Sequence, residues 1–288
     1  MLRIFGINKI KKSTIANIGI VLGVTNAIIF YYTYTNVKKN RPQFLHIDPP
    51  TEKHRIAIFD NLASTYDSTF NNVFERHGIS KAKKILLRSA RGHVLDVCSG
   101  TLNNLPFYRN IDSLTCIDKS PNMCLEMVKK IEKERPEFPV VILCDDVKSI
   151  PFEDCSFNTV VSTHSLCSVE DPDALMSEVD RVMKPSAKFL SVERGKIYYY
   201  PIRKLMELLQ LYPNDNVPWN YGYFEHRDPI DLVDKKLEIS KFGIFGYGIN
   251  YSILARKRDK SPSNFIQNPQ ILPNAHIFYT YTPSMDEC

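Results

Sequence analysis

The chain has 288 residues, with 37 lysines and arginines against 32 aspartates and glutamates and a net charge of +5. Seven of the bases precede Asp48, the first acidic residue, so subtracting them leaves the rest of the chain at −2. The basic character therefore belongs to the N-terminus rather than to a face that binds nucleic acid, and we expect no nucleic-acid partner.

The N-terminus contains a run of 25 uncharged residues between Lys12 and Lys38. About 20 apolar residues suffice for a helix to cross a bilayer, so the run predicts one transmembrane helix over about residues 13–35. Three tyrosines at its end suit the lipid interface, where amphipathic rings are favoured. A cleaved signal peptide is the alternative, although no clear small-x-small cleavage site precedes Lys38. We expect residues 1–41 to form a basic N-terminus with a single-pass membrane anchor.

Strand and helix patterns alternate from residue 42 to residue 258, which predicts one globular domain of about 215 residues. Continuous apolar runs mark the first four predicted strands as buried parallel strands. The expected fold class is α/β, a doubly wound Rossmann-like domain. The predicted strands are residues 93–97, 113–118, 140–145, 157–163 and 187–193, and the predicted helices lie around residues 79–89, 121–134 and 173–183.

The C-terminal segment, residues 259–288, is polar and interrupted by prolines, without periodicity. We expect a tail that is either disordered or docked on the domain.

Seven cysteines are present, none of them in a C-x-x-C pair, and four lie in or next to predicted strands. This placement is typical of small buried apolar residues rather than of metal ligands or disulfides. We expect no metal site.

The first two predicted strands and the turn between them indicate a nucleotide-like ligand. Ser99, Gly100 and Thr101 allow a tight turn whose amide groups face a ligand, and the positive end of the following helix would point the same way. The second strand ends on Asp118, 22 residues after Asp96. Such folds place an acid there to accept hydrogen bonds from ribose hydroxyls.

Five segments in order, VLDVCSGT, IDKSPNM at 117–123, and residues 145–161, 166–185 and 189–195, resemble the successive motifs of a class I S-adenosylmethionine (SAM) methyltransferase. The resemblance covers about residues 59–257 and is closest to the ubiquinone/menaquinone C-methyltransferase-like group. It implies a mostly parallel sheet of seven strands. Residues 59–67 are similar to that group's opening helix, in which a Tyr-Asp pair lies over the cofactor.

Within this group, the runs LCSVED, ERG and WNYGYFEHRDPIDLV resemble membrane-anchored methyltransferase-like proteins of mitochondria, the family named for suppressing oxidase-assembly defects. The mammalian anchored alkyl-thiol methyltransferases are nearby relatives. The resemblance implies a membrane-anchored SAM-dependent methyltransferase with a lipophilic or membrane-associated acceptor. Its expected location is the mitochondrial inner membrane, with the endoplasmic reticulum second. The alternative is a methyltransferase-like membrane protein with weakened SAM binding that serves mitochondrial assembly.

The resemblance also implies a set of cofactor contacts. A carboxylate suits the adenine amino group, because an exocyclic amine can only donate hydrogen bonds. The neighbouring Asp145 remains an alternative for that contact, since a slip of one residue would exchange the two acids. The implied residues are Asp96, Cys98, Ser99, Gly100 and Thr101 for the amino-acid end of SAM, Asp118 for the ribose, Met123 beside the adenine, and Asp146 and Val147 for its edge.

The glycine-rich motif departs from the family pattern. D-x-G-x-G-T-G runs here from Asp96 to Leu102, so that Cys98 and Leu102 replace two glycines. A leucine is bulky for a helix start near the cofactor, and we expect Leu102 to crowd the cofactor or to stiffen the turn, the alternative being that it is a fitted part of a working pocket. This expectation favours the alternative of weakened SAM binding.

Methyl transfer needs the acceptor aligned with the sulfonium and, if the acceptor holds a proton, a base to take it. His164 and His226 are the candidates, and a purely structural histidine is the alternative at each position. Glu193 and the tyrosines at 198–200 could line the acceptor pocket, or serve packing instead. Arg227 and Asp228 could pair to fix the segment around His226. A dinucleotide oxidoreductase is disfavoured because the turn lacks G-x-G-x-x-G.

Overall fold

The computed structural model describes residues 12–40, 48–258 and 268–283. The chain divides into two compact units, Met1–Asp48 and Pro49–Cys288. The first unit contains one helix, α1 (Lys12–Asn40), over the run in which the sequence predicts a helix. None of the helices in the described residues has both the length and the apolar character needed to cross a membrane. The prediction of a membrane-spanning anchor over residues 13–35 is therefore not supported.

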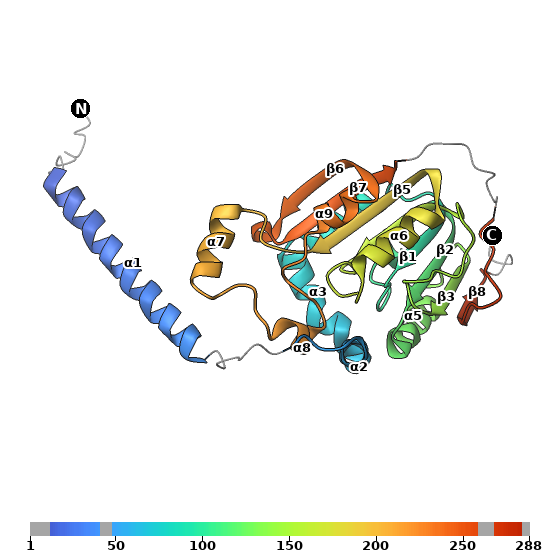
Figure 1. The fold of residues 1–288 in the computed structure, drawn as a ribbon, viewed down its shortest axis with the longest axis horizontal. Coiled ribbons are helices and arrows are strands. Elements are labelled where there is room, and N and C mark those ends of the chain that lie inside the picture. Colours follow the sequence, from blue (N-terminus) through green and yellow to red (C-terminus); the bar gives the residue numbers. More distant parts are fainter. Residues whose placement is uncertain (1–11, 41–47, 259–267, 284–288) are drawn as a thin grey trace, which may run out of the picture. The chain divides into compact units, whose positions relative to one another are not determined.

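The second unit is built on a twisted sheet whose described part has eight strands in the order β6-β7-β5-β4-β1-β2-β3-β8 (Figure 1). The central strands β1 to β5 pair in parallel, while β7 pairs antiparallel with β5 and β6, and β8 pairs antiparallel with β3. The predicted mostly parallel α/β architecture is thus confirmed. The strands are β1 (Gly92–Val97), β2 (Ile111–Asp118), β3 (Val140–Cys144), β4 (Phe157–Thr163), β5 (Met183–Arg194), β6 (Leu237–Phe245), β7 (Asn250–Lys257) and β8 (Ile277–Tyr281).

The count of seven strands was wrong because of the tail. Residues 277–281, with the sequence IFYTY, add β8 to the outer edge of β3. This sequence is rich in aromatic and β-branched residues, which favour strands. By pairing with β3, it also covers backbone groups that would otherwise stay unpaired at the edge of the sheet. Of the two expectations for the tail, docking on the domain is the one confirmed for residues 268–283.

Helices cover both faces of the sheet. Those found where the sequence predicts them are α4 (Ile79–Leu87), α5 (Pro121–Glu134) and α6 (Pro172–Val182). The start of α5 follows from local chemistry, since the Ser120 hydroxyl accepts a hydrogen bond from the Met123 amide and proline occupies the first helical position. The other helices are α2 (Glu52–Leu62), α3 (Tyr66–Arg76), α7 (Tyr200–Leu208), α8 (Val217–Tyr221) and α9 (Pro229–Asp234), with short 3₁₀ turns at Ala63–Thr65, Leu105–Phe107 and Gly246–Gly248.

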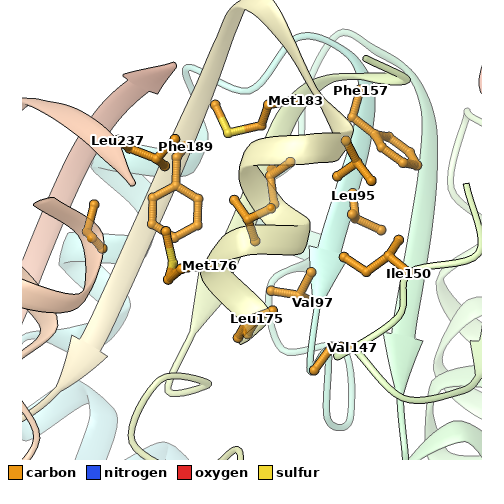
Figure 2. Close-up of a cluster of buried hydrophobic side chains, with 14 of the residues drawn as sticks. Leu95, Val97, Val147, Ile150, Phe157, Leu175, Met176, Met183, Phe189 and Leu237 are labelled. Atoms are coloured by element: carbon orange, nitrogen blue, oxygen red, sulfur yellow. The ribbon is translucent and has the colours of Figure 1, made fainter. Parts of the chain in front are cut away.

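Two hydrophobic clusters follow from the alternation of side chains along β1. Leu95 and Val97 point into a cluster with α6 and α9, shown in Figure 2, while Val94 points into a second cluster with α4 and α5. Successive residues of a strand face opposite sides of the sheet, so each face has its own core. Because side chains pack on both faces of the sheet, the loops at the carboxyl ends of its strands are held in place. The polar residues of the candidate site lie in these loops.

Candidate functional site

A cavity lies at the carboxyl ends of the parallel strands, the edge at which open α/β sheets bind ligands. With the solvent at its mouth it contains about 1000 Å³ of empty space. Its walls come from the turn after β1, the end of β2, residues 146–148 after β3, and the end of β4. Helices α2, α3 and α4 complete the walls with Phe59, Tyr66, Phe74 and Lys83, among others.

The turn after β1 keeps an unusual backbone path. Cys98, Gly100 and Leu102 have φ of 50°, 56° and 60°, all in the left-handed region. These are the three positions at which D-x-G-x-G-T-G has glycine, so the path of the motif is retained although two glycines are gone. A residue with a side chain pays roughly 1–2 kcal/mol for this conformation. A Cβ built on Gly100 would meet no atom within 4 Å, which leaves open cavity space beside that residue.

Leu102 does not line the cavity. Its side chain is fully buried in the core cluster that contains Leu87 and Tyr108. The expectation that Leu102 crowds a cofactor is therefore wrong. The left-handed backbone turns the side chain into the core, where burying a leucine contributes about 1.5–3 kcal/mol and offsets the strain.

Asp118 connects β2 to this turn. Its Oδ2 accepts a hydrogen bond from the Gly100 amide (2.8 Å), and its Oδ1 accepts one from the Ser120 amide (2.9 Å). Burial raises the pKa of this carboxyl above its ordinary value, against the opposing effect of those two amides. Each oxygen has a second lone pair. Asp118 can therefore accept two further hydrogen bonds, one on each oxygen. The two hydroxyl groups of a vicinal diol can donate that number.

Asp96 lies behind the cavity wall rather than in it. Its Oδ2 accepts hydrogen bonds from Asn104 (2.9 Å) and the Tyr108 hydroxyl (2.7 Å), whereas Oδ1 is buried without a partner among the described residues. Burial raises the pKa of Asp96 to about 6. An orphaned buried acceptor is costly, and a positively charged amine is a donor that would satisfy it.

The other residues predicted to contact the cofactor also line this cavity. Met123 and Val147 line it as nearly buried apolar residues. Asp146 also lines it, paired with Lys119 (2.7 Å) and Lys148 (3.5 Å). Burial alone would raise the pKa of Asp146, but the hydrogen bond from Lys119 holds it below the ordinary value.

Asp145, the alternative to Asp146, is directed elsewhere. One of its oxygens accepts from the Asp146 amide (2.8 Å), and the other accepts from the His276 amide (3.4 Å) next to β8. Asp145 thus ties the docked tail to the sheet, and the cavity wall contains Asp146 instead.

The two candidate histidines are separated. His164 lines the cavity, stacked on Phe74 with ring centroids 5.2 Å apart. Burial lowers the pKa of His164 to about 3, so it is neutral at physiological pH and a weak base. His226 is not part of the cavity wall and packs edge-on against Phe224.

Two of the remaining candidates, Glu193 and Arg227, hold the loop after β4 in place and do not line the cavity. Glu193 is fully buried and accepts hydrogen bonds from the Ser162 hydroxyl (2.6 Å) and the Leu166 amide (3.2 Å). Arg227 donates to the carbonyls of Leu166 (2.7 Å) and Val169 (2.6 Å), so it fixes this loop rather than pairing with its neighbour Asp228. The three tyrosines at 198–200 are exposed.

Sequence reasoning pointed to the Tyr66-Asp67 pair, because residues 59–67 resemble an opening helix over the cofactor, but it missed Phe74 on α3 and Lys83 on α4. Asp67 accepts hydrogen bonds from Thr101 (2.5 Å) and Lys130 (2.7 Å), which ties the opening helices over the turn. Lys83 lines the cavity from α4 although it is only 5% exposed. One signal was present for it: Lys83 stands four residues after Ile79 and four before Leu87, on the apolar face of its helix.

Comparisons with known proteins agree with this geometry. Residues 95–191 match the family profile described as a methyltransferase domain. The chain is 25% identical over 167 residues to "Methyltransferase OMS1, mitochondrial" of Saccharomyces cerevisiae, covering 52% of this chain and 36% of that protein. It is 33% identical over 157 residues to a demethylmenaquinone methyltransferase of Leptospira interrogans, covering 48% of this chain and 59% of that protein.

Among solved structures, the DhpI–SAH complex superposes with a TM-score of 0.53 at 18% identity, over 72% of this chain and 98% of that one. At this identity the likeness shows the fold. The chain spans about one third to three fifths of the length of the two curated relatives.

Proposed function

The globular unit of this chain belongs to the class I SAM-dependent methyltransferases, and from that premise we propose that it transfers the methyl group of SAM to an acceptor bound beside Phe74 and His164. The resemblance seen in the five sequence motifs is thereby confirmed at the level of the family. The acceptor and the roles of single residues are our proposals.

The residues present fit SAM. Asp118 keeps two acceptor positions for the ribose hydroxyls, and Gly100 leaves the open space that a nucleoside beside it requires. Asp96 Oδ1 is a buried acceptor without a partner among the described residues, directly behind the turn that would hold the amino-acid end. Met123, Val147 and Asp146 would hold the adenine. When bound, SAM supplies an electrophilic methyl group on a sulfonium.

The main support for the proposal is the hydrogen bond that joins Asp118 to the turn after β1. A single carboxylate joins the end of β2 to the amide of Gly100 at 2.8 Å and still faces the cavity. Hydrogen bonds from the turn thus fix the carboxylate before any ligand arrives. This preorganisation lowers the cost of ordering the site on binding.

Support for an active site rather than a weakened one comes from Leu102. The assembly alternative rested on its bulk and on Cys98, yet the backbone keeps the left-handed path at both residues and Leu102 points into the core. We therefore favour a working methyltransferase.

The acceptor is proposed to be lipophilic. Ile56, Phe59, Tyr66, Phe74 and Val169 give the cavity a set of apolar and aromatic lining side chains. A relative is named a demethylmenaquinone methyltransferase, and a quinone ring is planar. Aromatic side chains such as Phe74 suit a planar ring by offset stacking.

Association with a mitochondrial membrane completes the proposal. Its support is the relative named as mitochondrial and the exposed apolar side chains of α1, among them Ile28 and Phe30. Centrifugation of lysed mitochondria that contain the full-length protein, at physiological salt, tests it. Recovery in the membrane pellet is expected, and complete release into the supernatant would contradict the membrane part of the proposal alone.

Titration of SAM into the full-length protein tests the proposed function at its first step. We expect saturable binding that S-adenosylhomocysteine displaces. Absence of binding at millimolar SAM, by protein that unfolds cooperatively on heating, would restore the assembly alternative.

A further inference from the structure

Lys83 stands out among the lysines that line the cavity. Lys119 is paired with Glu52 (3.0 Å) and Asp146 (2.7 Å), and Lys148 is paired with Glu170 (2.7 Å). Lys83 has no such partner among the described residues. Its ammonium group makes a cation–π contact with the Phe74 ring, 5.4 Å from the centroid, and no hydrogen bond within the described chain.

The acids whose charges act on Lys83 each accept hydrogen bonds from other donors, although Asp96 Oδ1 has no partner among the described residues. Asp96 on β1 accepts from Asn104 and Tyr108, and Glu193 on β5 accepts from Ser162 and Leu166. Asp67 on α3 accepts from Thr101 and from Lys130, a base whose charge opposes protonation of Lys83. Burial outweighs these distant acids and lowers the pKa of Lys83 to about 8. A substantial fraction of the Lys83 side chain is therefore unprotonated at mildly alkaline pH.

Lys83 lies beside the part of the cavity in which we place the methyl acceptor. Phe74 contacts both Lys83 and His164. Ile79 and Leu87, one turn to either side on the same helix face, are buried, so α4 holds the lysine stem against the core. The amine thus reaches the apolar part of the cavity where we place the methyl acceptor.

We propose that Lys83 is the base that takes the proton from the methyl acceptor, and that the acceptor is a weak O–H or S–H acid that is protonated in neutral water. This assignment rests on the proposed methyltransferase function. It replaces both histidines, because His164 is too weak a base in its buried site and His226 lies outside the cavity wall.

The step balances without a further reactant. The lone pair of the Lys83 nitrogen binds the acceptor's proton, and the ammonium formed lies over the electron-rich face of Phe74. The electron pair left on the acceptor's oxygen or sulfur forms the bond to the methyl carbon. The carbon–sulfur bond breaks at the same time, and its pair remains on sulfur as a neutral thioether. Lys83 then returns its proton to solvent through the cavity mouth.

Two thiols of different acidity test the assignment on the full-length protein with SAM as donor. Phenylmethanethiol is mostly protonated near pH 7.5, whereas thiophenol is mostly ionised and needs no base. Removing a positioned base costs about 10²–10⁴-fold in rate. We expect Lys83→Met to lower kcat by about 100-fold or more with phenylmethanethiol and by less than about 5-fold with thiophenol. The wild-type rate with phenylmethanethiol should rise with pH through about 8 and then level, and Lys83→Met should lose this inflection.

Lys84→Met is the matched control, since Lys84 is the next residue on α4 and is exposed. It should leave both rates and the pH profile unchanged. Lys83→Arg keeps the charge but cannot accept a proton at these pH values, so it should fail with phenylmethanethiol as Lys83→Met does. Recovery of the rate by arginine would show a purely electrostatic role and overturn the proposal.

The remaining outcomes separate the two proposals. Wild-type protein that binds SAM and methylates neither thiol would contradict the proposed function. Equal losses on both thiols with Lys83→Met, or a loss of SAM affinity of about 10-fold or more, would overturn only the base assignment. Competitive acylation of Lys83 across pH, read by mass spectrometry, needs no turnover. A Lys83 that titrates above pH 10 in that experiment would also overturn the base assignment.

Discussion

The two halves of the cavity, which we propose hold the cofactor and the methyl acceptor, are built by different means. In the cofactor half, a short stretch of chain supplies the contacts: the turn after β1 and the end of β2 are joined by the hydrogen bond between Gly100 and Asp118. In the acceptor half, side chains arrive from elements far apart in sequence, among them Phe74 on α3, Lys83 on α4 and His164 after β4. The first half depends on backbone conformation and the second on packing, so substitutions should affect them differently.

The largest effect is expected from Leu102, where the cofactor half meets the core. Leu102→Ala should destabilise the protein by about 2–5 kcal/mol, because it leaves a cavity among buried side chains. SAM affinity of the folded fraction should stay within about 3-fold of wild type, because the side chain faces away from the cavity. Chemical denaturation and SAM titration of the same preparation measure both quantities.

Leu102→Gly sharpens this prediction. Glycine tolerates the φ of 60°, so this variant should be more stable than Leu102→Ala by about 1 kcal/mol, the reverse of the usual order. A SAM affinity raised 10-fold by glycine would instead mean that Leu102 crowds the ligand, as the sequence alone suggested.

A second effect concerns the support of the acceptor half. Burial raises the pKa of Glu193 to about 7, above its value in the unfolded chain. A group with a raised pKa in the folded state contributes stability that is complete below the unfolded pKa and is lost as pH rises through the folded one. Stability should therefore fall by about 1–3 kcal/mol between pH 5 and pH 8 through this group.

Glu193→Gln removes the titration and keeps one acceptor oxygen for the Leu166 amide, while its NH2 group can donate to the Ser162 hydroxyl, which is able to accept. Its denaturation midpoints should vary less between pH 5 and pH 8 than those of the wild type. An unchanged pH dependence in the variant would show that Glu193 is already ionised at pH 5 or that another group dominates.

The smallest effect is expected at Cys98. Its φ of 50° is strained for a residue with a side chain, and Cys98 lines the cavity rather than the core centre. Cys98→Gly should stabilise the protein by about 0.5–1 kcal/mol. A loss of more than about 1 kcal/mol in thermal unfolding would mean that the cysteine packs better than its half-buried position suggests.

The sequence predicted the cofactor half because its signals are local. Ser120 and Pro121 announce the start of α5, and the apolar strand, turn and acid that end in Asp118 lie within 26 residues of chain, from His93 onward. The acceptor half left no such pattern. A lysine on a helix normally reaches solvent, so Lys83 could be assigned to the cavity only once the packing of α4 was known. The edge strand β8 escaped prediction for a similar reason, because its partner β3 lies more than 130 residues earlier.

The affinity of SAM for two aspartate variants of β2 tests the central claim most directly. Asp118 ends the strand in the cavity wall, and Asp112 near its start is exposed. Asp118→Ala should weaken SAM binding by about 1.5–3 kcal/mol, the scale of hydrogen bonds to a charged group, while Asp112→Ala should bind as the wild type does. Equal affinities for the three proteins, with cooperative unfolding intact in each, would contradict the assignment of this cavity to SAM.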